Sequence, residues 1–351
     1  MKNFLIGGSD STNTITIIVG IICLLGIIGI VVYIIVISNT QKVKTPLITP
    51  IIKTNSINEP LIAPIIKTNN INDNTITKNN NYTILKFIQN DTITITSPIK
   101  INYLIVAGGG AGGNGGIDRT GAGGGAGGYI LGSTTLKEGK YDVVIGAGGN
   151  ASSNSFNGKN SSFNSLIAIG GSGGSPGNTD SEIGGSGGGQ SHSGSYKTSL
   201  SGTVNQGHDG GIGYDSGTDT FAAAGGGGAN SPGENGTSTK GGDGGLGITI
   251  SNTNLPGFND TIKICGGGGG AIQVLNKVLL PNGKGNFGGG DGGACSNMFK
   301  NGDGKCPSNN GCFCATNATT YGSGGGGGID NYNYPGNGGN GFPGIVIITY
   351  Q

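Results

Sequence analysis

Runs of consecutive glycine dominate the sequence and decide what the chain can fold into. Glycine supplies 79 of the 351 residues, and all but five of these glycines lie after residue 81. An ordinary helical core is excluded, because each glycine in a helix costs roughly 1 kcal/mol relative to alanine. A collagen triple helix is also excluded, since collagen needs glycine at every third position with abundant proline. Here glycine comes in runs, and only 12 residues are proline.

Glycine runs can still form an ordered structure. An extended left-handed helix with three residues per turn rises about 3.1 Å per residue and has no internal hydrogen bonds, so its N–H and C=O groups point outward. Several such helices side by side can pair these groups, as buried backbone requires. The alternative is a low-complexity linker without order. Four runs have a suitable length for the ordered form: Gly121–Gly128, Ala224–Ala229, Gly266–Gly270 and Gly324–Gly328.

Strand-like segments punctuate residues 82–351 and favour the ordered form. They are rich in β-branched residues, with alternating or continuous apolar character. They predict a mainly β fold, in which paired strands at the two ends of the segment anchor the glycine runs between them. The predicted strands are Tyr82–Phe87, Thr92–Thr96, Ile101–Val106, Lys140–Ile145, Ser165–Ile169, Ile248–Ile250, Thr261–Ile264, Ala271–Leu280 and Ile345–Tyr350.

The order of strands and glycine runs carries a resemblance. The segments are, in order, KINYLIVAGGGAGG, GAGGGAGGYI, GKYDVVIGAGG, NGKNSSFNSLIAIGGSGG and GFPGIVIITY. This order resembles the glycine-rich domain of bacteriophage tail-fibre adhesins and of many giant-virus and bacterial surface proteins. The resemblance implies a β-sandwich scaffold, packed polyglycine II helices, and variable loops at one end that contact a receptor.

An uncharged apolar segment precedes this domain. After a short tail (1–14), residues 15–37 form 23 apolar-rich positions inside a charge-free stretch between Asp10 and Lys42. About 20 such residues span a bilayer, so the segment predicts one transmembrane helix. A cleaved signal peptide and a buried globular helix are the rival interpretations. The first has a shorter apolar region and a small-residue cleavage site, and the second would show a polar face.

Residues 38–81 read as a linker. They contain a 14-residue tandem repeat, PLITPIIKTNSINE from Pro46 and PLIAPIIKTNNIND from Pro60. Paired prolines favour extended backbone and block helix. The segment therefore predicts a disordered stalk, although its isoleucines, including Ile66, would suit partial packing. The Asn-, Ile- and Lys-rich anchor and linker also resemble proteins of AT-rich genomes, such as those of large DNA viruses of protists.

Four cysteines gather near the C-terminal end of the domain. Cys295, Cys306, Cys312 and Cys314 have the spacing C-x10-C-x5-C-x-C in a polar, turn-rich segment. Zinc sites usually show closer pairs, so two local disulfides are the main interpretation, with a metal site or free thiols as alternatives. Cys265 would then be the unpaired cysteine. Disulfides indicate an oxidising compartment, whereas lysines after the apolar segment favour a cytosolic domain.

Composition excludes several functions. The net charge is +1 and only 11% of residues are charged, so nucleic acid is not expected as a partner. The pattern G-x-G-x-x-G at Gly108, Gly110 and Gly113 follows a strand but is not followed by a helical sequence, as a dinucleotide site requires. No catalytic arrangement stands out in a chain with two histidines, and neither a cofactor nor a metal is expected.

The remaining candidates suggest recognition by loops. Their side chains combine aromatic surface with polar tips, which suits contact with a glycan or a protein. The hypothesis is a non-enzymatic, single-pass membrane protein of a virion or host membrane, whose glycine-rich domain faces outward and binds a receptor or glycan. The alternative is a structural protein that self-associates. Asp-Gly pairs at Asp209, Asp243, Asp291 and Asp303 are expected to form turns. The candidate recognition residues are His192, Tyr196, His208 and Tyr214.

Overall fold

The computed structural model divides the chain into two compact units, Met1–Pro60 and Leu61–Gln351. The second unit begins well before the predicted boundary at residue 82. The structure describes residues 16–21, 32–37, 66–68, 75–79, 81–116, 119–153, 155–175, 183–191, 201–275, 279–295, 312–329 and 336–351.

The described part of the first unit is a pair of antiparallel strands. β1 (Thr16–Ile21) pairs with β2 (Val32–Ile37), and Thr16 faces Ile37. Both strands lie inside the segment predicted as one helix, so the structure differs from that prediction at both ends of the segment. Ile and Val fill these strands, and β-branched residues favour extended backbone over helix. The described residues contain no helix with the length and apolar character that crossing a bilayer requires.

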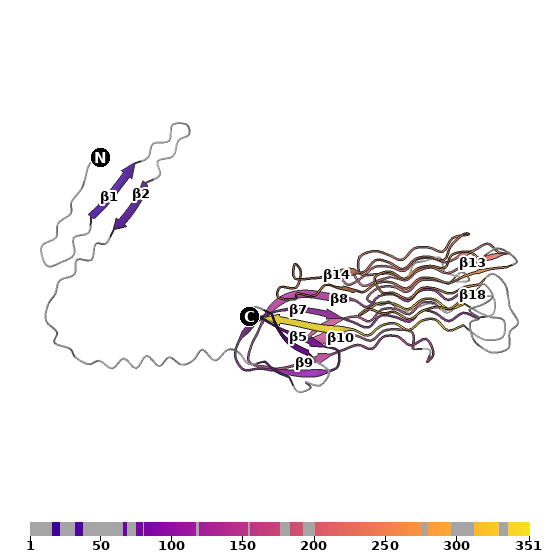
Figure 1. The fold of residues 1–351 in the computed structure, drawn as a ribbon, viewed down its shortest axis with the longest axis horizontal. Helices are drawn as coiled ribbons and strands as arrows, with labels where there is room; N and C mark the ends of the chain where they lie inside the picture. The colour runs from indigo at the N-terminus through magenta and orange to yellow at the C-terminus, as the bar shows by residue number, and fades with distance from the viewer. Residues whose placement is uncertain are drawn as a thin grey trace. The chain divides into compact units, whose positions relative to one another are not determined.

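Two five-stranded antiparallel sheets face each other at one end of the second unit (Figure 1). Their apposed faces form one apolar core that includes Phe87, Ile93, Ile101, Phe163 and Ile348. In sheet order the first consists of β4 (Thr75–Asn79), β5 (Tyr82–Phe87), β19 (Ile345–Tyr350), β7 (Ile99–Val106) and β8 (Tyr129–Leu136). The second consists of β11 (Leu166–Ala168), β10 (Ser161–Phe163), β9 (Gly139–Val144), β6 (Asp91–Ile95) and β3 (Ile66–Thr68).

The first sheet is covered on both faces, which explains its continuous apolar strands. Side chains alternate along a strand, so Ile101 and Ile105 of β7 enter the core between the sheets, whereas Leu104 enters a second core. The hairpin of β14 (Ile248–Ile250) and β15 (Ile262–Ile264) contributes to this second core.

Strands β3 and β4 correct the linker prediction. Both lie within residues 38–81, yet each is hydrogen-bonded at the edge of a sheet. Ile66 is only 8% exposed and belongs to the main core. The Pro- and Asn-rich composition suggested a stalk up to residue 81, but burial of Ile66 and pairing with β6 and β5 order these short segments.

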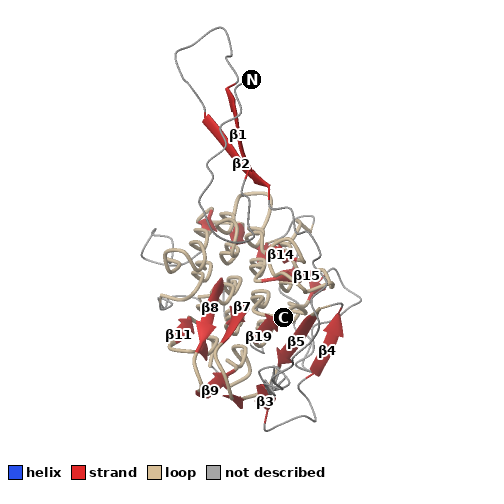
Figure 2. Cartoon of the chain, turned by 90° about the vertical axis from the view of Figure 1, so that its left-hand side faces the viewer, coloured by secondary structure: helices blue, strands red, loops and turns tan. Residues whose placement is uncertain are grey.

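Glycine runs leave the sheets and pack side by side along the long axis of the unit (Figure 1). Figure 2 looks along them from the sheet end, and they appear end on as separate tan coils. We call the runs between residues 107 and 344 the glycine bundle. No strand or helix is assigned within 107–115, 121–128 or 223–229, apart from isolated bridges. Their backbone hydrogen bonds connect segments that are mostly far apart in the sequence.

The run 121–128, which we call the central run, shows how the pairing works. All eight of its N–H groups donate to carbonyl groups of three neighbouring runs, at 2.7–3.2 Å, and each neighbour recurs at every third residue. Its carbonyl groups accept from three further runs, so six runs surround it. This is the hexagonal packing expected for three-residue helices without internal hydrogen bonds. The acceptors for residues 121 to 128 are Gly328, Ser175, Ala224, Gly325, Ser172, Gly227, Gly322 and Ile169.

This close packing is what makes glycine necessary. A Cβ added at Gly125 would lie 2.3 Å from the carbonyl oxygen of Ser186, far inside van der Waals contact. Small side chains occur where the lattice leaves room for them, as at Ala122 and Ala126, which are fully buried. Substituting glycine in the lattice therefore forces backbones apart, and a displaced backbone loses hydrogen bonds on several sides.

We predict that Gly125→Ala destabilises the full-length protein by about 3 kcal/mol, because the overpacked methyl group meets rigid backbone. The matched control is Gly116→Ala, whose added Cβ would find no atom closer than 3.8 Å. The control should change stability by less than about 0.5 kcal/mol. Denaturant unfolding measures both, and equal midpoints for the two variants would contradict the close-packed lattice.

The bundle ends in a third sheet, far from the first two (β13 and β18 in Figure 1). We call this end the distal end. Its strands are hydrogen-bonded in one row, with a single parallel pair, β16 and β17. The sheet consists of β12 (Tyr214–Asp215), β13 (Thr220–Ala222), β16 (Ile272–Val274), β17 (Ala294–Cys295) and β18 (Cys312–Phe313).

Candidate functional site

The distal sheet is where side chains replace glycine at the end of the bundle. Ala222, Ile272, Val274 and Ala294 form a small buried core there, and Tyr214 packs against it. Larger side chains fit because the runs have ended and strands space the backbones further apart. The distal end therefore holds side chains that are too large for the interior of the glycine lattice.

A disulfide links the edge strand of this sheet, β18, to its neighbour β17. Cys295 of β17 and Cys312 of β18 face each other in register and are bonded, with Cα atoms 4.2 Å apart. The next residue, Phe313, is 57% exposed. Cys314 is disulfide-bonded as well, and Cys306 lies outside the described residues. The disulfide thus fixes the backbone from which the exposed Phe313 ring projects.

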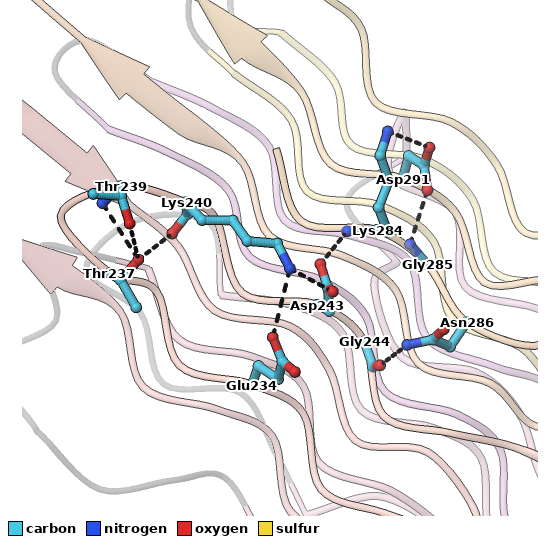
Figure 3. Close-up of polar contacts among 10 residues, drawn as sticks. All are labelled: Glu234, Thr237, Thr239, Lys240, Asp243, Gly244, Lys284, Gly285, Asn286 and Asp291. Carbon is cyan, nitrogen blue, oxygen red and sulfur yellow. Dashed lines mark hydrogen bonds and ion pairs between the residues drawn. The ribbon is translucent and has the colours of Figure 1, made fainter. Parts of the chain in front are cut away.

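Charged residues gather on the side of the bundle (Figure 3). The Lys240 ammonium lies 2.5 Å from the Asp243 carboxylate and 3.7 Å from that of Glu234. The Lys284 ammonium lies 3.0 Å from Asp291. Within the part of the chain that the structure describes, there is no group of three or more metal-ligating side chains suited to an ion. These carboxylates instead form ion pairs with the lysines, and those of Asp243 and Asp291 also accept hydrogen bonds from backbone N–H groups.

The three Asp-Gly pairs that the structure describes do not form turns, contrary to the sequence interpretation. Asp209, Asp243 and Asp291 lie in extended runs, and Asp303 lies outside the described residues. Each of the three carboxylates accepts a hydrogen bond from a backbone N–H of a neighbouring run, donated by Gly202, Lys284 and Gly285 respectively. At the edge of the bundle a run lacks a neighbour, and the side-chain oxygen takes the place of its carbonyl group.

We predict that Asp243→Ala lowers the free energy of unfolding by about 1.5 kcal/mol, because the Lys284 N–H loses its acceptor. Asp243→Asn keeps an amide oxygen at that place and should cost less than about 1 kcal/mol. Thermal unfolding at 50 mM salt measures both. The control is Asp260→Ala at an exposed site, and a loss as large there would refute the capping role.

Comparison with known families agrees with this architecture. A family model described as a glycine-rich domain matches residues 88–351. The chain belongs to this glycine-rich domain family. No curated protein matches the chain at a significant level.

The structure describes two of the four predicted recognition residues, His208 and Tyr214, and these two lie at different levels of the domain. His192 and Tyr196 lie outside the described residues. His208 is exposed on the side of the bundle, and its backbone N–H donates to the Gly228 carbonyl group. Tyr214 pairs with Ala222 in the distal sheet. Six residues separate these two levels along one run, which corresponds to roughly 19 Å at about 3.1 Å per residue.

Sequence reasoning missed Phe313, which lies between two predicted disulfide cysteines. A lone exposed aromatic residue in a polar segment gives little signal by itself. The register of β17 with β18 is what places its ring at the distal surface. Tyr214 and Phe313 therefore share one sheet, whereas His208 belongs to another surface.

Cys265 is the free cysteine of the described chain, and it is fully buried. It lies where β15 continues into the bundle, with φ of +57°, and belongs to the second core with Leu104. Burial raises the pKa of its thiol above the usual range. A thiolate is the reactive form of cysteine, so this residue serves packing.

We predict that Cys265 resists iodoacetamide at pH 8 while the protein is folded. In 6 M guanidinium the same thiol should react at the rate of a free cysteine, because unfolding exposes it to solvent. Mass spectrometry of the Cys265 peptide measures the alkylated fraction. Rapid labelling of this peptide in the folded protein would refute its burial.

Proposed function

We propose that the glycine-rich domain is a non-enzymatic recognition module whose distal end contacts a receptor or glycan on a cell surface. The observation that carries this proposal is that the two ends of the domain differ: the chain enters and leaves at one end, and an exposed aromatic side chain lies at the other. The first and last strands of this domain, β3 and β19, both lie in the sheets at one end. The segment that precedes the domain therefore joins it at this end, which we call the attachment end. The opposite end presents the exposed Phe313 on a disulfide-bonded strand.

Rigidity supports this role. Phe313 follows directly on the disulfide-bonded Cys312, and β17, its partner strand, continues from a run of the bundle. A ring held on a fixed backbone loses little conformational freedom on binding, which favours affinity. Exposed aromatic residues are also common anchors at binding surfaces. The order of strands and runs resembles that of phage and giant-virus surface proteins, which is consistent with such a display.

Self-association through the bundle has less support. Side-chain oxygens of Asp209, Asp243 and Asp291 occupy backbone donors at the edges of the bundle. An edge whose donors are satisfied offers little to the backbone of a second copy, just as protected edge strands resist pairing. The capped sides therefore favour recognition at the distal end over lateral assembly.

We also propose that residues 15–37 anchor the protein in a membrane of a virion or host cell, with the domain outside. The support is the sequence, because an uncharged apolar segment of this length matches the thickness of a bilayer. The disulfide between Cys295 and Cys312 favours an oxidising, external side.

An antibody against a tag after Gln351 tests the placement. Labelling of intact cells that express the full-length protein is expected, and a tag on a cytosolic protein is the control that stays unlabelled. If the tag becomes accessible only after permeabilisation, the domain faces the interior and external recognition is wrong.

A binding experiment tests the distal surface. Phe313→Ser should lower binding of the full-length protein to a responsive cell type at least tenfold, because it removes the exposed ring. Val204→Ser is the matched control, since Val204 is 82% exposed but does not belong to the distal sheet. Binding is measured by flow cytometry. Equal losses in both variants, or no loss in Phe313→Ser, would contradict the assignment.

A further inference from the structure

A groove lies at the other end of the bundle, between β8 and the hairpin of β14 and β15. Its volume is about 380 Å³, within the range of small-ligand sites. It is remote from the distal sheet, because β8 belongs to the sheets at the attachment end. Its lining includes Tyr129, Leu131, Asn230, Thr249, Asn254 and Phe287.

Phe287 is the unusual residue of this groove. Its φ is +48°, a left-handed conformation that bulky side chains rarely adopt. Its carbonyl oxygen accepts hydrogen bonds from the hydroxyl groups of Thr320 and Ser323, at 2.5 and 3.3 Å. These bonds hold the strained turn. In a chain with 79 glycines, a phenylalanine at a position suited to glycine indicates a use for the ring, since strain gathers at functional sites.

The Asn254 side chain in this groove is held by two hydrogen bonds. The Asn254 Oδ1 accepts from the Ser251 N–H at 2.7 Å, and its Nδ2 donates to the Thr249 carbonyl at 3.3 Å. The backbone N–H of Asn230 donates to the Leu246 carbonyl group at 2.8 Å. This bond fixes the backbone that carries the exposed Asn230 side chain. Amide side chains supply both donors and acceptors.

Among the residues that the structure describes, no charged side chain belongs to the groove lining. The ammonium group of Lys263, on β15, lies 5.4 Å from the centre of the Phe287 ring. An uncharged lining with aromatic rings and amides suits a neutral ligand that has an apolar face and hydroxyl groups. Saccharide rings have this character, since their C–H faces pack on aromatic rings and their hydroxyl groups bond to amides.

We propose that this groove binds a neutral saccharide of one or two rings, with Phe287 and Tyr129 contacting its C–H faces and Asn230 and Asn254 its hydroxyl groups. The site is separate from the distal surface, and it stands whether or not Phe313 takes part in recognition.

Saturation-transfer NMR on the purified full-length protein tests the proposal. The probes are maltose, lactose, cellobiose and N,N′-diacetylchitobiose, with sialyllactose as the acidic comparison. Transfer to the ring protons of at least one neutral disaccharide is expected. Transfer to none of them, or to sialyllactose alone, would overturn the proposal.

Variants locate the bound sugar. Phe287→Gly removes the ring and suits the left-handed backbone, so the fold should persist while the affinity for the responding disaccharide falls at least tenfold. Asn230→Ala, at an exposed position, should weaken binding about fivefold without changing the melting temperature. Phe313→Ser is the control that should bind the sugar normally. Unchanged binding in both Phe287→Gly and Asn230→Ala would overturn the assignment. Loss in Phe313→Ser alone would place the sugar at the distal end and overturn it as well.

Discussion

The structure depends on one constraint, that a three-residue glycine helix cannot satisfy its own backbone. Every N–H and C=O inside the bundle must be paired by another run. The central run meets this requirement with acceptors on three neighbours and donors from three more. Close approach of the backbones makes the bonds possible, and the absence of Cβ atoms makes the close approach possible. The high glycine content and the close packing of the runs therefore follow from the same requirement for backbone pairing.

The ends and the sides of the bundle follow from the same requirement. A lattice of nearly identical runs has little to set which runs lie adjacent, because most side chains are hydrogen atoms. The sheets at each end supply this information through apolar cores and, at β17 and β18, a disulfide. On the sides, where a neighbour is missing, Asp and Asn side chains complete the pairing, as Asp243 does for Lys284. The side chains to which we assign recognition thus lie at the ends, where glycine gives way to strands.

Much of the fold could be predicted from local patterns, since β-branched segments such as Ile345–Tyr350 and glycine runs both have strong signatures. The pairing between runs could not, because every run offers the same backbone groups. Short strands were missed where tertiary contacts order weak sequences, as at Ile66–Thr68 in the Pro- and Asn-rich segment. The candidate site was found only in part. The cysteine cluster marked the distal end, but register rather than spacing brings Cys295 to Cys312 and exposes Phe313.

Hydrogen exchange of the full-length protein, measured by NMR, tests the central claim most directly. If the central run lies in a hexagonal lattice, all eight consecutive amides from Gly121 to Gly128 are protected, and their exchange requires opening of the bundle. Amides of the exposed turn 216–218 should exchange much faster. Protection of alternate residues only would indicate an edge strand. Exchange of the whole run at the rate of an unfolded chain would show that the runs are not packed and would contradict the account.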